Sequence, residues 1–290
     1  MGVEKSGDVY IKTDSVNPTN TELEALSLEW LASGMQSGGA HVVPVVDVER
    51  GSISTRAVLS TRCTSDAAFQ FGRALAWTHA EGSDFFGQAP TGWEGDGWMG
   101  RSELTYVDRP GVHDGWGDFY AQERILPHLP IAVDNGAIDK SGMQVVERLC
   151  ERLRDRDFDT PQPALVRDVA SRIHGDLWTG NVIWTRTSEL DWAPEEAGFG
   201  SSEEELPEVV GVLIDPAAHG GHAEKDLADL GVFGQPHWEQ IYAGYNEESP
   251  LESGWQERIG LHQLHILMVH ANLFGGSYGY EAVLTAKKYI

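Results

Sequence analysis

Cysteine, basic residues and long apolar runs are all scarce in this chain of 290 residues. The two cysteines, Cys63 and Cys150, provide no disulfide framework and are typical of a reducing compartment. Only 21 Lys and Arg face 45 Asp and Glu, and the formal net charge of -24 makes nucleic acid and anionic membrane surfaces poor partners. No apolar run approaches the roughly 20 residues of a membrane span, and the N-terminus lacks the apolar segment of a signal peptide. We therefore expect a cytoplasmic protein with no nucleic-acid or membrane partner.

Apolar residues and tryptophan are, in contrast, well represented. Hydrophobic residues make up 41% of the chain and ten tryptophans are present, which is typical of a packed globular protein. A chain of this length can hold one large or two modest domains, each with a buried core. The exception is the stretch from Arg186 to Glu208, which carries eight acidic residues and one basic residue. We expect this stretch to form a solvated surface loop.

The most informative segment runs from His174 to Asn181 and reads HGDLWTGN. Asp176 and Asn181 have the D-x-x-x-x-N spacing of a kinase catalytic loop, with His-Gly in place of His-Arg before the aspartate. A second aspartate, Asp215, follows the apolar, strand-like run 209–214. In a phosphotransferase, one aspartate orients and deprotonates the attacking hydroxyl, while an asparagine and another aspartate hold Mg²⁺ against the nucleotide phosphates. We therefore predict Asp176 as the catalytic base and Asn181 and Asp215 as the Mg²⁺ ligands.

Several segments resemble the fructosamine (ketosamine-3) kinase family. HGDLWTGN is similar to the HGDLWSGN of that family, and residues 213–217 and 221–228 are similar to its I-D-P-A-x-x-x-G-x-x-E-x-D-L-A segment. Residues 249–258 and 273–276 resemble its C-terminal helices, so that the match covers nearly the whole chain from Lys12. A lone HGDxxxxN would suggest only the wider group of aminoglycoside- and choline-kinase-like proteins. The longer string is more specific to the ketosamine-3-kinases.

The resemblance implies a two-lobed, protein-kinase-like fold of the α+β class. We expect a small β-rich N-terminal lobe over residues 1–62, which binds the nucleotide. A larger, mainly helical C-terminal lobe over residues 63–290 would carry catalysis and substrate binding. The hinge between the lobes would contact adenine through backbone groups near Leu59 and Thr61.

The start of the chain resembles the small lobe of a kinase. A short β-prone run ends in Lys12, and apolar residues then recur at helical spacing through Trp30, which predicts a strand followed by a helix. In that arrangement Lys12 contacts the α- and β-phosphates of ATP and forms an ion pair with a glutamate of the helix. We assign this glutamate to Glu24, with Glu22 as a close competitor.

The family carries a glycine-containing β-hairpin before the lysine strand, and this hairpin covers the phosphates. Only residues 1–8 precede the strand here, and we expect a hairpin of two strands to need more chain. The prediction is therefore that the phosphate-covering hairpin is absent or a stump, and that the small lobe is truncated. Either the true start lies upstream, or nucleotide binding is impaired.

Other residues are weaker candidates for the site. Trp178 and His222 are second-tier candidates that would shape the pocket for the acceptor. Three histidines, His262, His265 and His270, share one predicted helix, but their spacing differs from the H-x-x-x-H pattern of two zinc ligands on a helix. We therefore predict no zinc site there.

The function implied by the resemblance is ATP- and Mg²⁺-dependent phosphorylation of the C3 hydroxyl of a ketosamine. The substrate would be a small-molecule ketosamine or a glycated protein, and the reaction would serve deglycation. Two alternatives stay open. One is a small-molecule kinase of the same fold that acts on an aminoglycoside, choline or another hydroxyl acceptor. The other is a non-catalytic pseudokinase that keeps the Mg²⁺ residues but lacks the phosphate-covering loop.

Overall fold

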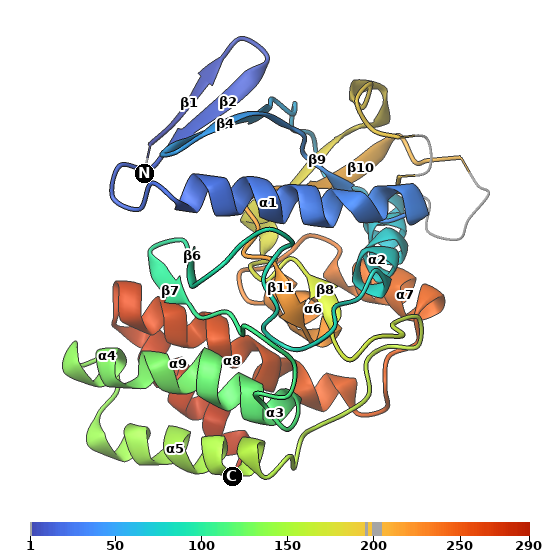
Figure 1. The fold of residues 1–290 in the computed structure, drawn as a ribbon. Helices are drawn as coiled ribbons and strands as arrows, with labels where there is room; N and C mark the ends of the chain where they lie inside the picture. The colour runs from blue at the N-terminus through green and yellow to red at the C-terminus, as the bar shows by residue number, and fades with distance from the viewer. Residues whose placement is uncertain (1, 195–196, 199–204) are drawn as a thin grey trace.

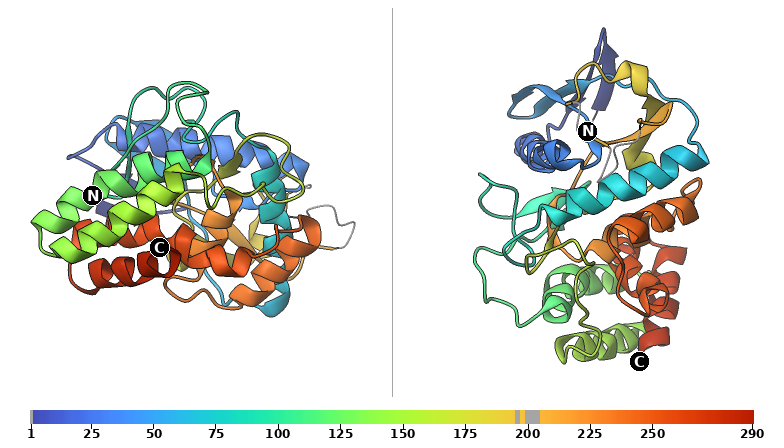
Figure 2. Two further views of the ribbon diagram at one scale, coloured as in Figure 1. Left: turned by 90° about the horizontal axis from the view of Figure 1, so that it is seen from below. Right: turned by 90° about the vertical axis from the view of Figure 1, so that its right-hand side faces the viewer.

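Two lobes make up the molecule in the computed structural model, which describes residues 2–194, 197–198 and 205–290. Figure 1 shows the β-rich N-terminal lobe above the mainly helical C-terminal lobe, with helix α1 running across the molecule beneath the strands. The right-hand view in Figure 2 shows the same two layers from the side, with α2 (cyan) between them. No helix in the described part of the chain is long and apolar enough to cross a membrane.

The N-terminal lobe is built on a four-stranded antiparallel sheet with the strand order β1-β2-β5-β4. Its elements are β1 (Gly2–Ser6), β2 (Val9–Thr13), α1 (Asn20–Ala32), β4 (Val45–Glu49) and β5 (Ser52–Arg56). Leu23, Leu28 and Leu31 of α1 are buried, whereas Leu26 and Trp30 are partly exposed. The helix therefore packs within the lobe and holds Glu24, which is also buried, in place.

Strands β1 and β2 form a hairpin, in which β2 is the strand that carries Lys12. The strands pair in register from Gly2 opposite Thr13 to Ser6 opposite Val9, so that only two residues remain for the turn. Gly7 has a φ of 60°, a left-handed conformation that a two-residue hairpin turn requires and that glycine adopts without strain. Among the described residues, one strand, β1, therefore precedes the lysine strand, and the prediction of a stump ahead of that strand is not overturned.

A second sheet lies at the junction of the lobes. It has the order β3-β10-β9 and contains β3 (His41–Val42), β9 (Val182–Arg186) and β10 (Val209–Leu213). Strand β3 pairs parallel to β10, which connects a segment of the first fifty residues to the catalytic region. The extended segment 57–64 then leads from β5 into α2, and the boundary predicted at residue 62 falls within it.

The C-terminal lobe is mostly helical around two short antiparallel strand pairs, β6–β7 and β8–β11. Its helices are α2 (Ser65–Ala80), α3 (Trp116–Phe119), α4 (Leu129–Asp134), α5 (Lys140–Arg154), α6 (Ala223–Leu230), α7 (Trp238–Glu248), α8 (Trp255–Phe274) and α9 (Ser277–Ala286). Its strands are β6 (Gly97–Met99), β7 (Ser102–Leu104), β8 (Ser171–Ile173) and β11 (His219–Gly221). Helices α2 and α7 touch backbone to backbone, because a side chain on Gly72 would lie 2.0 Å from the carbonyl oxygen of Ile241.

The acidic stretch 186–208 is less uniformly solvated than we predicted. Residues 195–196 and 199–204 lie outside the described residues. Within the described part, Ala197 is fully buried, and Leu190 and Trp192 pack against the core. The amide of Gly198 donates to the carbonyl oxygen of Gly39. At least this part of the stretch is therefore attached to the body of the protein.

Buried histidines are a conspicuous feature of both lobes. Eight of the eleven histidines are buried: His41, His79, His128, His174, His219, His222, His262 and His265. Burial lowers the pKa of His41 to about 4, of His128 to about 4 and of His222 to about 3, because the charged imidazolium loses its hydration. These side chains are consequently neutral in the folded protein at pH values where the unfolded chain already binds a proton.

The first prediction follows for acid stability. Each such histidine has a folded pKa below its unfolded value of about 6.5, so its contribution to stability is complete above pH 6.5 and is lost as the pH falls toward 4. His41 has no hydrogen-bond partner for either ring nitrogen among the described residues, and His41→Leu removes its proton uptake. We expect this variant to reduce the pH dependence of the unfolding free energy in that window by up to roughly 1.4 kcal/mol per pH unit.

Urea unfolding at several pH values measures this slope. His237→Asn serves as the control, since His237 is exposed and its left-handed backbone also suits asparagine. The same slope in wild type and His41→Leu would contradict the assignment of a depressed pKa to His41.

Candidate active site

The segment predicted to be catalytic lies between β8 and β9 as a compact loop that ends in a short 3₁₀ turn. Gly175 adopts a φ of +82°, and a side chain there would lie 2.0 Å from the carbonyl oxygen of Ala217. The amide of Ala217 in turn donates to the carbonyl oxygen of His174 at 2.9 Å. Glycine is thus required at position 175, because the loop runs directly against the segment that follows Asp215.

Helix α6 holds this loop from below through Asp226. Its Oδ2 accepts the amide N–H of His174 at 2.6 Å, and its Oδ1 accepts that of Gly175 at 2.9 Å. The ring of His79 approaches the same carboxylate with Nε2 at 3.2 Å from Oδ2. Although burial alone would raise it, the hydrogen bond and charge of His79, together with the charges of Lys225 and His174, hold the pKa of Asp226 well below its usual range. The backbone of the loop is therefore fixed by a buried, ionised carboxylate.

Asp176 and Asn181 face each other within the loop. The Nδ2 of Asn181 donates to the backbone carbonyl oxygen of Asp176 at 2.8 Å and to its Oδ2 at 3.1 Å. Because the amide nitrogen is used in this way, the amide oxygen of Asn181 is left to act as a ligand. Burial raises the pKa of Asp176 to about 7, while the Lys225 ammonium and the Asn181 amide oppose the shift.

Lys12 joins the two lobes through two carboxylates. Its Nζ lies 2.6 Å from Oε2 of Glu24 in α1 and 3.0 Å from Oδ1 of Asp215, just beyond β10. The helix glutamate that reaches Lys12 is thus Glu24. Asp215 has a φ of 52°, a left-handed conformation that is uncommon outside glycine and that aspartate tolerates better than most residues.

The charges in this group compete with one another. Burial raises the pKa of Glu24 to about 7 against the pull of Lys12, and the nearby charge of Asp215 adds to the rise. Burial acts in the opposite sense on Lys12, but the two carboxylates outweigh it and raise the lysine pKa. Although burial opposes it, the ammonium of Lys12 lowers the pKa of Asp215. For Glu24, burial thus outweighs the 2.6 Å ion pair with Lys12, which Asp215 also contacts.

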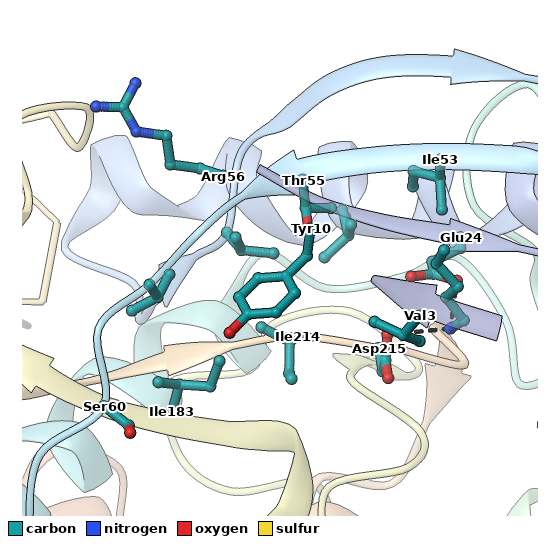
Figure 3. A pocket seen from close by; sticks show the side chains of 14 residues that line it. Val3, Tyr10, Glu24, Ile53, Thr55, Arg56, Ser60, Ile183, Ile214 and Asp215 are labelled. Carbon is teal, nitrogen blue, oxygen red and sulfur yellow. Dashed lines mark hydrogen bonds and ion pairs between the residues drawn. The ribbon is translucent and has the colours of Figure 1, made fainter. Parts of the chain in front are cut away.

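A cavity of about 300 Å³ opens beside Lys12 between the lobes. It is lined by Val3, Tyr10, Lys12, Glu24, Leu28, Val43, Ile53, Thr55, Arg56, Val58, Ser60, Ile183, Ile214 and Asp215. Figure 3 shows the Tyr10 ring reaching from β2 into this space toward Ile183 and Ile214. The lining is mostly apolar, with the charged group at one end, as expected for a site that takes a flat base and a phosphate chain.

At the hinge, the side chains of Val58 and Ser60 line the cavity, whereas that of Leu59 is 56% exposed. The amide N–H of Thr61 donates to the carbonyl oxygen of Trp184 at 2.7 Å, so it is not free for a ligand. The contact of other backbone groups near Leu59 with adenine stays a prediction.

Trp178, two residues after Asp176, begins a row of aromatic rings. Its ring meets Phe233 edge to face at 5.5 Å between centroids, and Phe233 lies 5.0 Å from the ring of His270. His270 in turn lies 5.3 Å from Phe274, which is 67% exposed. Sequence reasoning did not connect Phe233 or His270 with Trp178, because they come from segments that only the folded lobe brings together.

His222 lies at the start of α6, and its role in shaping the acceptor pocket stays a prediction. The side chain is buried and caps α6, since Nδ1 accepts the amide N–H of Glu224 at 3.3 Å. Its ring packs beside His262, so that these two histidines and Glu224 form a compact group of metal-ligand type. Arg258, however, donates to both carboxylate oxygens of Glu224, at 2.8 and 2.5 Å. We therefore interpret the group as a neutralised ion pair with two packed imidazoles.

The second prediction concerns Asp226. In Asp226→Asn one oxygen becomes an N–H₂ group that faces a backbone N–H donor, so a buried donor loses its acceptor. We expect this change to lower the free energy of unfolding by roughly 3 kcal/mol. Urea unfolding measures the loss, with Asp155→Asn at an exposed site as the control, for which we expect less than about 0.5 kcal/mol. A loss below about 1 kcal/mol for Asp226→Asn would show that the loop does not depend on this carboxylate.

Comparison with known proteins gives a consistent result. The model of the family described as fructosamine kinase matches residues 3–290. A Synechocystis protein named "probable ketoamine kinase" is 33% identical over 221 residues, which cover 76% of this chain and 61% of that protein. The match thus spans less than two thirds of that relative. Mouse ketosamine-3-kinase is 28% identical over 297 residues, and the alignment covers 94% of this chain and 84% of the mouse protein.

Solved structures agree with the fold. The crystal structure of a Thermobifida fusca protein, described as a "putative fructosamine-3-kinase", has a TM-score of 0.76 at 35% identity and covers 97% of this chain and 85% of that one. An aminoglycoside phosphotransferase bound to gentamicin has a TM-score of 0.56 at 10% identity, which shows a common fold alone. The predicted two-lobed, protein-kinase-like α+β fold is therefore confirmed.

Proposed function

The chain belongs to the fructosamine kinase family, and we propose that it transfers the γ-phosphoryl group of ATP to the C3 hydroxyl of a ketosamine. The observation that carries this proposal is the convergence of the four groups that such a transfer needs. Lys12 and Asp215 are in contact across the lobes, and Asn181 joins Asp176 within the same loop. The names of the Synechocystis and mouse relatives support a ketosamine as the acceptor.

Each of these residues has a distinct task in the proposed reaction. Lys12 binds the α- and β-phosphates, and its pair with Glu24 keeps it oriented. Asp176 accepts the proton of the acceptor hydroxyl. The hydroxyl oxygen bonds to the γ-phosphorus while the bond from that phosphorus to ADP breaks, and ADP leaves. A pKa of about 7 suits this role, because a base is most effective when its pKa lies near the working pH.

The donor atoms also fit Mg²⁺. Asn181 offers a free amide oxygen and Asp215 a carboxylate, which are the hard oxygen ligands that this ion prefers. When bound, Mg²⁺ would neutralise charge on the nucleotide phosphates. Lys12 already places one positive charge beside Asp215, so the same carboxylate serves both cations.

The acceptor would occupy the side of Asp176 that Trp178, Phe233 and His270 line. Aromatic faces stack on the apolar faces of sugar rings, and a partly exposed row of rings beside the base suits a sugar-derived substrate. The phosphorylated adduct would then be removed, so we propose a deglycating role toward small amines or glycated proteins. Aminoglycoside or choline phosphorylation is the second candidate, supported only by the common fold.

A pseudokinase is the remaining alternative, and it rests on the missing two-stranded, glycine-containing hairpin ahead of the Lys12 strand. One strand, β1, precedes that strand among the described residues, and Val3 of β1 and Tyr10 of β2 line the cavity beside Lys12. Nucleotide binding therefore decides between the kinase and the pseudokinase.

The third prediction separates catalysis from binding. Asp176→Asn keeps an oxygen to accept the hydrogen bond of Asn181 but cannot take up the acceptor proton. We expect it to lower kcat by about 10²-fold or more, with the affinity for Mg-ATP unchanged. Lys12→Ala should weaken nucleotide binding as well as turnover, because Lys12 contacts the phosphates. Steady-state kinetics with fructosyl-lysine, beside calorimetric titration with a non-hydrolysable ATP analogue, measures both effects.

Full turnover by Asp176→Asn would remove Asp176 from the role of base. If neither wild type nor variant binds the ATP analogue, the pseudokinase interpretation is correct. Asp155→Asn is the matched control, because it makes the same chemical change at an exposed position away from the cavity.

A further inference from the structure

A lysine and an aspartate are buried as a pair directly beneath the catalytic loop. Lys225 is only 3% exposed and Asp229 is fully buried, and they lie one turn apart on α6. The Nζ of Lys225 forms an ion pair with Oδ2 of Asp229 and donates to the carbonyl oxygen of Gly175 at 2.5 Å. The pair thus touches the residue that immediately precedes the proposed base.

Asp229 has no other function that the contacts reveal. Its Oδ2 binds Lys225, and its Oδ1 has no hydrogen-bond partner among the described residues. Burying two charges costs free energy that their attraction often fails to recover, and an apolar pair of similar volume is commonly as stable or more so. Helix α6 presents apolar neighbours such as Leu227 and Leu230 to the same core. Stability is therefore a poor explanation for a charged pair at this place.

The bond from Lys225 acts on one particular peptide group. The carbonyl of Gly175, the amide N–H of Asp176 and the Cα of Asp176 belong to the same planar unit, so fixing the carbonyl fixes the place from which the Asp176 side chain starts. Asp226 already holds the preceding amides of the loop, but neither of its bonds reaches this unit. Gly175 itself has no side chain with which to restrain its left-handed conformation.

We propose that Lys225, held in place by Asp229, is a positioning residue that orients the peptide group between Gly175 and Asp176 and so aims the Asp176 carboxylate at the acceptor hydroxyl. This inference rests on the proposed kinase function. It extends that function, because the pair does not line the cavity and instead contacts the loop at Gly175.

The double variant Lys225→Met/Asp229→Leu tests the proposal, because it removes both charges together and leaves no unpaired carboxylate. We expect the melting temperature to stay within a few degrees of wild type and the affinity for an ATP analogue to stay within about twofold. We expect kcat with fructosyl-lysine to fall by about 10-fold or more, with little change in the KM for the acceptor. A displaced base lowers the rate of the chemical step, whereas loss of substrate contacts would raise KM.

A second variant keeps the test decisive if the double variant does not fold. Lys225→Ala retains Asp229 and leaves a space that n-propylamine fills, with its ammonium group where Nζ was. Recovery of kcat by at least about fivefold with n-propylamine, and none with n-propanol, supports the proposal. Failure of the amine to restore any activity would overturn it.

The outcomes also separate this proposal from the proposed function. A folded double variant with the kcat of wild type would show that the pair is only structural, while the kinase assignment stands. Absence of ketosamine-dependent ADP formation by wild type would refute the proposed function itself. A double variant with raised acceptor KM and unchanged kcat would also contradict a positioning role.

Discussion

One ammonium group holds the two lobes together at the site. Lys12 of the β1–β2 hairpin contacts Glu24 of α1 and Asp215 of the C-terminal lobe at the same time. The two carboxylates share this ammonium, and the pKa of Glu24 is raised by its burial and by the charge of Asp215. Phosphates would add negative charge to a region where two carboxylates already share one lysine. We infer that Mg²⁺ must enter with the nucleotide, because otherwise the phosphates would meet the field of a protein with a net charge of -24.

The loop from His174 to Asn181 also depends on buried charged side chains, which come from helix α6. Buried polar groups must be paired, and the first turn of α6 supplies partners for the backbone of the loop on both the donor and the acceptor side. Asp226 accepts two amides and Lys225 donates to a carbonyl. Pre-organisation of this kind places the base before the substrate arrives, so that little reorganisation is needed in the reaction itself.

Local patterns were predictable from the sequence, and long-range packing was not. The spacing from Asp176 to Asn181 is short enough that the loop itself brings them together, and Glu24, the preferred candidate over Glu22, is the glutamate that meets Lys12. The pairing of β1 with the lysine strand was not predicted, although Gly7 permits the two-residue turn between them. The packing of His222 against His262 was not predictable either, because His262 belongs to α8, which lies far along the chain. At the hinge, the sequence does not determine which side chains of the segment face the cavity.

The central claim is that phosphate moves from ATP to a sugar hydroxyl of a ketosamine. The most direct measurement is ³¹P NMR of a reaction with ATP, Mg²⁺ and fructosyl-lysine, beside parallel reactions with an aminoglycoside and with choline. The account predicts ADP together with an equal amount of a phosphate ester that couples to the proton on C3 of the sugar. ATP hydrolysis without a sugar phosphate, or an ester formed only on the aminoglycoside or choline, would contradict it.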